Sequence, residues 1–582
     1  MTTAEDPLTA PRGRTAEPHP AGPRAPAHSG PFDPESTLRL RVLPAPGRPQ
    51  PTPGYTIDEI TRADWVLGPV PDRGWSARPH ARRTLVSRAL LVCLLLVQTV
   101  LSLRLHNTAF EDEALYVYAG HAMIDHLFHG VPDYGGFSGY FSGSPALYPV
   151  LAAWVDSVGG LTAVRLMSLA FMLGATGLLY SLTRMLFNER AALCAAGIFA
   201  VCQSTLFLGY FATYDALAIL LLALTAWLLV RTAPGHWALP LATAPVAFLA
   251  VGVKYASALY LPTLAVLLVL AAHRHLGRRQ ALRRGAAFTA GVTVLLGIGL
   301  ATTDYLQAIR STTTDRAHGT TSVATMAWDC FRWGGLIFVL ACLGSALYAR
   351  RDRLGEVPGG SRTGPGTGWR LALGAVLTGS ALLAPAYQIQ LQTSVSLHKH
   401  IGYGLLFAAP MAGVGISRLM GAHFRFPQAA IAVGVLALTL GMSQSAQNYG
   451  MWPSTSYLMP ELAKNVRPGQ KWLGQPHEAP VYYLSRAGLT DYTYWTSIYY
   501  IDYTGRGGHL TGAEGYRAAI DDGWFDGVVL DWSDQPGDVQ TLIRAEMRTS
   551  GRYRLASALT YRTSVGTGHF EIWLRLPAAH KH

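Results

Sequence analysis

Long apolar runs recur along this chain of 582 residues and leave few globular folds open to it. A helix that crosses the hydrocarbon core of a bilayer needs about 20 apolar residues, and the runs have about that length. Only 14% of the residues are charged, and the mean hydropathy is +0.21. The pattern predicts an α-helical polytopic membrane protein with about eleven transmembrane helices. The expected spans are residues 85–104, 161–186, 191–210, 214–231, 237–253, 256–272, 286–303, 333–349, 371–388, 401–419 and 428–446.

The basic residues indicate how these spans are oriented. One set of loops is rich in arginine, for example around Arg82, Arg184, Arg231 and residues 273–284. The loops that alternate with them, such as 105–160 and 304–332, carry fewer basic residues. The positive-inside rule places the first set in the cytoplasm. We therefore expect a multi-pass protein of the cytoplasmic membrane with a cytoplasmic N-terminus. The net charge of +12 is explained by these loops, so no nucleic-acid partner is expected.

Three regions are expected. Residues 1–80 are rich in Pro, Gly and Ala, and a disordered cytoplasmic arm is predicted there. Residues 81–449 form the transmembrane region, with a first outer loop over 105–160. Residues 450–582 are polar enough for a small extracytoplasmic α/β domain. Within it we predict buried strands at 480–484 and 527–531, a helix at 513–522, and a strand or hairpin over 561–575.

Three carboxylates, Glu111, Asp112 and Glu113, stand where the chain leaves the first span. Charges are costly at that depth, so they require partners or a function. The stretch 113–129 has helical periodicity and is predicted to lie at the interface, ending at Gly130 and Pro132. A second short apolar helix is expected to open at 145–149. A solvated loop remains the alternative for the three acids.

Other ionisable residues fall in the same outer layer of the membrane. They are Asp215, Lys254 and the segment His398, Lys399 and His400. Each has an ordinary alternative: a helix N-cap for Asp215, snorkelling for Lys254, and a solvated loop for the last three. Acids and bases from distant positions nevertheless meet in one layer, so we predict one polar cavity facing outward.

The sequence does not indicate a cofactor firmly. His121, Asp125 and His129 share a helix face at a spacing that can hold a divalent cation, but no third element matches them. Ordinary interface histidines are therefore favoured, and a divalent cation stays open. The five cysteines contain no CxxC pair, and the chain has neither a P-loop nor a GxGxxG unit.

Several motifs together resemble one family. Residues 112–116 (Asp-Glu-Ala-Leu-Tyr) are similar to the acidic first-loop motif of GT-C membrane glycosyltransferases, in the branch of protein O-mannosyltransferases and lipid A aminoarabinose transferases (family 39 type). Residues 143–148 are similar to the loop before the second span in that family, with Ser144 where a lysine is common. Residues 211–216 and 252–255 match further segments that carry Asp215 and Lys254. The resemblance covers roughly 85–450.

The resemblance implies a donor sugar on a polyprenyl phosphate and an inverting transfer to an acceptor hydroxyl. Asp112 would be the catalytic base, and Glu111 a solvated neighbour. Expected substrate-binding residues are Glu113, Tyr116, Asp215, Lys254, His398, Lys399 and His400. The acceptor can be a cell-envelope glycan, a lipid or a protein. Two alternatives stay open: a transporter or flippase of lipid-linked sugars, and a non-catalytic membrane scaffold.

Overall fold

The computed structural model describes residues 77–350, 366–421, 425–505, 508–533 and 537–577. The predicted N-terminal arm, 1–80, lies outside this part of the chain except for its last four residues.

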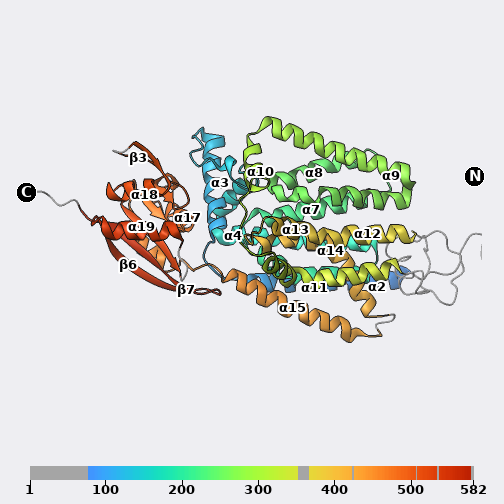
Figure 1. Ribbon diagram of the computed structural model, residues 1–582. Coiled ribbons are helices and arrows are strands. Elements are labelled where there is room, and N and C mark those ends of the chain that lie inside the picture. The colour runs from blue at the N-terminus through green and yellow to red at the C-terminus, as the bar shows by residue number, and fades with distance from the viewer. Residues whose placement is uncertain (1–76, 351–365, 422–424, 506–507, 534–536, 578–582) are drawn as a thin grey trace, which may run out of the picture. The chain divides into compact units, whose positions relative to one another are not determined.

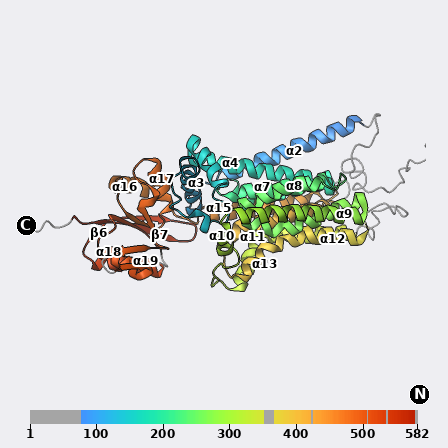
Figure 2. The same cartoon turned by 90° about the horizontal axis from the view of Figure 1, so that it is seen from above.

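Eight helices or helical segments are long and apolar enough to cross a membrane within the described residues. Figures 1 and 2 show them running side by side in one bundle. Their elements are α2 (Ala77–Leu103), α4 (Tyr148–Leu186), α7 (Tyr214–Arg231), α9 (Leu261–Thr302), α11 (Val323–Ala349), α12 (Thr367–Gly379) with α13 (Leu383–Gln390), α14 (Leu397–Leu419) and α15 (Pro427–Tyr449).

Three further passes complete the bundle. In α9 the chain reverses at Gly277, whose φ of 75° is left-handed, and Gly285 on the second arm lies against Val269 on the first. The short apolar helix α8 (Leu239–Val253) is another pass. The pair α5 (Glu189–Ala200) and α6 (Gln203–Leu208) runs between opposite ends of the bundle, from Arg190 beside Gly421 to Ala212 beside Glu113. The described helices therefore confirm the prediction of about eleven spans.

Helix α14 lies at the centre of the bundle, with 94% of its apolar window buried. It approaches α11 closely because small residues meet at the crossing. A Cβ atom on Gly344 would lie 1.9 Å from the carbonyl oxygen of Met411, and one on Gly415 would lie 2.4 Å from that of Leu340. This packing fixes the height of the polar first turn of α14, which carries Lys399 and His400.

The first outer loop contains the predicted interfacial helix, α3 (Glu111–His129). It ends at Gly130 in the left-handed conformation (φ 70°), as the sequence predicted. The second predicted short helix is the start of α4, which breaks at Gly159 and Gly160 before the membrane pass begins. The shorter elements of the membrane region are η2 (Phe137–Gly139), η3 (Tyr255–Tyr260), α10 (Tyr305–Thr312) and η5 (Ser380–Leu382).

The C-terminal region holds a five-stranded sheet of order β2-β1-β5-β7-β6, parallel at β2-β1-β5 and antiparallel at β5-β7-β6. Its strands are β1 (Trp472–Gly474), β2 (Trp495–Ser497), β5 (Gly527–Ser533), β6 (Tyr553–Arg562) and β7 (Thr567–Arg575), beside a hairpin of β3 (Asp502–Gly505) and β4 (Gly508–Thr511). The helical elements are α16 (Leu458–Asn465), α17 (Glu478–Arg486), η7 (Tyr492–Tyr494), α18 (Gly512–Asp521) and α19 (Asp538–Thr549).

The predicted strand at 527–531, helix at 513–522 and late hairpin are confirmed, whereas the strand predicted at 480–484 is wrong. That segment lies inside α17, with Val481, Tyr482 and Leu484 buried. Pro480 is in the first turn of the helix, where its missing N–H costs no hydrogen bond. A short apolar run with branched and aromatic residues does not distinguish a strand from a buried helix.

Candidate active site

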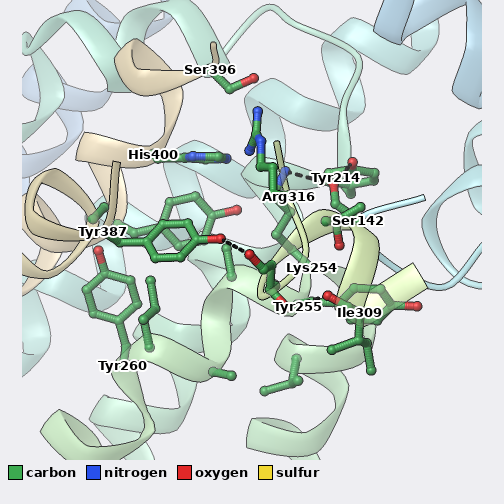
Figure 3. A pocket seen from close by; sticks show the side chains of 18 of the residues that line it. Ser142, Tyr214, Lys254, Tyr255, Tyr260, Ile309, Arg316, Tyr387, Ser396 and His400 are labelled. Atoms are coloured by element: carbon green, nitrogen blue, oxygen red, sulfur yellow. Dashed lines mark hydrogen bonds between the residues drawn. The ribbon is translucent and has the colours of Figure 1, made fainter. Parts of the chain in front are cut away.

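One cavity of about 820 Å³ lies at the end of the bundle where α3 begins. Figure 3 shows side chains from several elements around it. The polar residues that line it come from α3, the loop after it, α7, the α8–η3 junction and η3, α10 and the segment after it, α13 and α14. They are Asp112, Tyr116, Ser142, Tyr214, Lys254, Tyr255, Tyr260, Ser311, Thr312, Thr313, Arg316, Tyr387, Gln388, Ser396, Lys399, His400 and Tyr403.

Asp112 faces this cavity and forms an ion pair with Lys399. Its Oδ2 atom accepts a hydrogen bond from Lys399 Nζ at 2.7 Å. The two side chains differ in exposure, at 31% for Asp112 and 5% for Lys399. Asp112 lies in the first turn of α3, where unpaired backbone N–H groups favour a negative charge. A carboxylate that remains accessible while paired with a buried cation can exchange protons with a bound molecule.

Lys254 is the second buried cation of the cavity. The helix α8 ends at this residue, which adopts an extended conformation before η3 begins. Lys254 Nζ lies 3.5 Å from Asp215 Oδ1, 3.3 Å from Ser142 Oγ and 4.4 Å from the centre of the Tyr214 ring. Asp215 itself does not line the cavity. Its carboxylate accepts hydrogen bonds from Thr213 Oγ1 and Tyr403 OH, each at 3.0 Å. Asp215 thus positions Lys254 through their ion pair without lining the cavity itself.

Glu113 was predicted to contact substrate, but the structure places it away from the cavity. Its side chain is fully buried, and it pairs with Arg165 at 2.6 Å. It also accepts hydrogen bonds from the backbone N–H groups of Phe110 and Ala212. Both carboxylate oxygens of Glu113 therefore accept hydrogen bonds, and these bonds hold the start of α3 against the bundle.

His398 and His400, which were predicted together, have different surroundings in the structure. His398 packs edge-on against the Phe207 ring, with ring centres 5.0 Å apart, and it is not among the lining residues. His400 lines the cavity, and within the described structure its buried Nε2 atom has no hydrogen-bond partner. Figure 3 shows it among the lining side chains. His400 can therefore contact a molecule in the cavity, as predicted, whereas His398 cannot.

Tyr116 lines the cavity as expected, but its hydroxyl is already engaged. It lies 2.6 Å from the hydroxyl of Tyr214, which in turn bonds to Ser142. This chain of hydroxyl groups connects the first outer loop with the start of α7 next to Lys254. It can orient a polar group of a molecule that reaches the cavity.

Sequence reasoning missed Arg316, Tyr255 and Tyr387. Arg316 follows α10 in an outer loop that the charge pattern had marked only as poor in basic residues. The available signal was a basic residue in a loop expected to lie outside, which runs against the positive-inside trend, although Arg310 and Arg332 share that loop. Ser144, where the family resemblance led us to expect a cation, donates a hydrogen bond to Tyr305 and does not line the cavity. Arg316 is therefore a third cation beside Lys254 and Lys399.

The His121, Asp125 and His129 side chains on α3, for which a divalent cation was left open, have separate partners. His121 Nε2 lies 3.1 Å from Asp156, and His129 pairs with Asp125 at 3.0 Å. Over the ranges that the structure describes, no three His, Cys, Asp or Glu side chains gather where a metal ion would be held.

Glu111 was expected to be a solvated neighbour, and the structure contradicts this. Burial and then the negative charges of Glu478, Asp112 and Asp531 raise the pKa of Glu111 to about 8. It therefore belongs to a surface shared with the C-terminal region.

The fold and the cavity define a multi-pass membrane protein with a polar site, at the bundle end next to α3, that joins one carboxylate to three cations. Residues 146–301 match the family model for dolichyl-phosphate-mannose-protein mannosyltransferase. This match covers the start of α4 to the end of α9 and includes Asp215 and Lys254. Over this part, the chain is similar to a family of membrane glycosyltransferases.

Solved structures give weaker likenesses. The oligosaccharyltransferase of Archaeoglobus fulgidus in its apo form is 14% identical, with a TM-score of 0.40 over 61% of this chain and 56% of that one. The arabinofuranosyltransferase AftD from Mycobacteria is 14% identical, with a TM-score of 0.45 over 85% and 40%. ArnT from Cupriavidus metallidurans bound to undecaprenyl phosphate is 13% identical, with a TM-score of 0.42 over 84% and 98%. No curated protein matches the chain. The assignment therefore rests on the sequence match.

Proposed function

We propose that this protein transfers a sugar from a polyprenyl-phosphate donor to an acceptor hydroxyl at the outer face of the cytoplasmic membrane. The observation that carries the proposal is one cavity lined by the Asp112 carboxylate together with Lys254, Arg316 and Lys399. A base and a set of cations are the two requirements of sugar transfer from a phosphate.

In the proposed reaction, Asp112 accepts the proton of the acceptor hydroxyl. The hydroxyl oxygen attacks the anomeric carbon, and the bond from that carbon to the phosphate oxygen breaks. The configuration inverts because attack and departure occur on opposite faces of the sugar in a single displacement. The negative charge that develops on the departing phosphate is stabilised by Lys254, Arg316 and Lys399. Lys399 has two roles, since it pairs with Asp112 at 2.7 Å before the phosphate is present.

The apolar part of the cavity suits the lipid of such a donor. Leu259, Leu296, Leu300 and Ile309 line it on the side of η3, α9 and α10. An isoprenoid chain can reach this wall by lateral diffusion in the bilayer, whereas a soluble nucleotide sugar gains nothing from it. The arrangement therefore favours a lipid-linked donor.

We further propose the orientation that the basic loops indicate, with a cytoplasmic N-terminus and an extracytoplasmic C-terminal domain over 450–582. The cavity lies at the bundle end that carries the first outer loop. Basic residues gather at the other end, where Arg190 bonds to the carbonyl oxygen of Gly421. This distribution supports an outward site.

The test is Asp112→Asn in purified protein reconstituted with undecaprenyl-phosphate-linked sugars, with release of undecaprenyl phosphate as the readout. We expect at least a 100-fold loss of rate, since an amide cannot accept the proton. Asp304→Asn is the matched control, because Asp304 is an exposed outer carboxylate that does not line the cavity. Equal rates in wild type and Asp112→Asn at equal protein levels would overturn the role of Asp112. Movement of intact donor across the vesicle without release would favour the flippase alternative.

A further inference from the structure

A second polar surface begins one residue before Asp112, on the side of the C-terminal region. Three carboxylates meet there, Glu111 of α3, Glu478 of α17 and Asp531 of β5. Two tyrosines, Tyr140 and Tyr499, lie beside them. We call these five residues the acidic–aromatic cluster.

The cluster is held together by contacts between α17 and the first outer loop. Tyr482 OH donates a hydrogen bond to Asp156 at 2.6 Å, and Arg486 forms an ion pair with the same carboxylate. Tyr483 OH accepts a hydrogen bond from the N–H of Ala109 at 2.9 Å. Glu478 is the first residue of α17, so these contacts fix it beside the start of α3.

Members of the cluster influence one another through their charges. After burial, the charge of Glu478 is the largest influence that raises the pKa of Glu111 to about 8. After burial, the charges of Glu111 and Glu478 help raise the pKa of Tyr499 to about 12. Among the described residues, neither Glu111 nor Asp531 forms an ion pair with a lysine or arginine. Carboxyl groups whose pKa values are shifted by burial and by one another's charge are candidates for a ligand site.

One carboxylate oxygen in the cluster lacks a partner. Glu478 is 7% exposed, and its Oε2 atom has no hydrogen-bond partner in the described structure, while Oε1 lies 3.3 Å from His477 Nδ1. An unpaired buried acceptor is costly, so a donor from a bound molecule would complete it. Next to it, Tyr499 is 72% exposed and Tyr140 is 48% exposed, which leaves their rings available for stacking.

We propose that the acidic–aromatic cluster is the acceptor site and that its ligand is a neutral glycan. Sugar hydroxyl groups donate hydrogen bonds to carboxylates such as Glu478, and the C–H faces of sugar rings pack on tyrosines. The cluster repels phosphate, whereas the cavity with Lys254, Arg316 and Lys399 attracts it, so the two substrates are separated by charge. Glu111 and Asp112 both lie in the first turn of α3, so the proposed acceptor site begins at the same end of this helix as the proposed base. This inference rests on the proposed function.

The test measures binding of soluble neutral tetrasaccharides of mannose, galactose and arabinose to the full-length protein in nanodiscs, by saturation-transfer NMR and calorimetry. We expect at least one to bind, and Tyr499→Ala and Glu478→Gln each to weaken it about tenfold. Tyr457→Ala is the matched control, since Tyr457 is 78% exposed and outside the cluster. The same panel includes a serine- and threonine-rich peptide.

The inference is overturned if no tetrasaccharide binds the wild type, if the control weakens binding as much as the two cluster variants, or if only the peptide binds. If the glycan binds and the wild type still releases no undecaprenyl phosphate from any donor, the proposed function fails while the binding site stands. If release occurs but glycan binding does not depend on the cluster, the inference fails alone.

Discussion

The buried pair of Glu113 and Arg165 allows a quantitative test of what fastens the first outer loop. Glu113 accepts hydrogen bonds from Arg165 at 2.8 and 2.6 Å, from Ala212 N–H at 2.8 Å and from Phe110 N–H at 3.0 Å. Arg165→Met removes the counter-charge and leaves a fully buried carboxylate with two backbone donors. Removing one partner of a buried pair costs about 3–5 kcal/mol. We therefore expect Arg165→Met to lower the free energy of unfolding by about 4 kcal/mol.

The assay is thermal and denaturant unfolding in detergent, with Glu113→Gln and the double variant completing the cycle. The double variant carries no uncompensated charge, so it is expected to be less destabilised than the sum of the single variants by about 2 kcal/mol or more. Arg517→Met is the control, because its pair with Glu546 is exposed and is worth about 1 kcal/mol at most. The reasoning is refuted if the free energy of unfolding of Arg165→Met lies within about 1 kcal/mol of that of wild type. It is also refuted if the destabilisation of the double variant equals the sum of the destabilisations of the two single variants.

Three further outcomes are expected. Lys399→Met is expected to slow undecaprenyl-phosphate release about 100-fold, and an unchanged rate would remove Lys399 from the mechanism. Because the pKa of Glu111 is raised, its proton stabilises the fold at low pH and that stability is lost as pH rises from about 4.5 through about 8. Glu111→Gln is thus expected to show a smaller drop in Tm than wild type between pH 5 and pH 8.5, and parallel drops would contradict this. Gly344→Ala places a Cβ 1.9 Å from Met411 O and is expected to cost about 1–3 kcal/mol, whereas Gly297→Ala, which meets no atom within 4 Å, is expected to be tolerated.

The membrane passes could be predicted from the sequence because each needs about 20 apolar residues whatever its neighbours are. The interfacial helix α3 was also predictable, since its periodicity and the Gly130 end are local signals. The turn at Gly277 lies inside a run of arginines, and there the loop expected over 273–284 is mostly helical. Local signals therefore located the elements and set most of their boundaries.

The roles of adjacent charges could not be predicted in the same way. Asp112 and Glu113 are consecutive on one helix, so their side chains point about 100° apart, and only tertiary contacts decide which faces the cavity. The partner of Glu113 is Arg165, 52 positions away, which charge patterning alone does not connect. For the same reason, the sequence could not show that Lys399 and His400 line the cavity while the adjacent His398 packs elsewhere. Arg316 was overlooked because its loop was judged by its average charge.

The ion pair of Asp112 and Lys399 joins residues 287 positions apart, and this spacing has a consequence for biosynthesis. A ribosome adds about 5–20 residues per second, so the 287 positions take roughly 15–60 s to translate. During this interval the first outer loop has already left the membrane, while α14 has not yet been inserted. Asp112 then lacks its cation, and the cavity lacks the wall that α14 supplies. A nascent chain that stalls before α14 therefore has an incomplete cavity, even with the first outer loop in place.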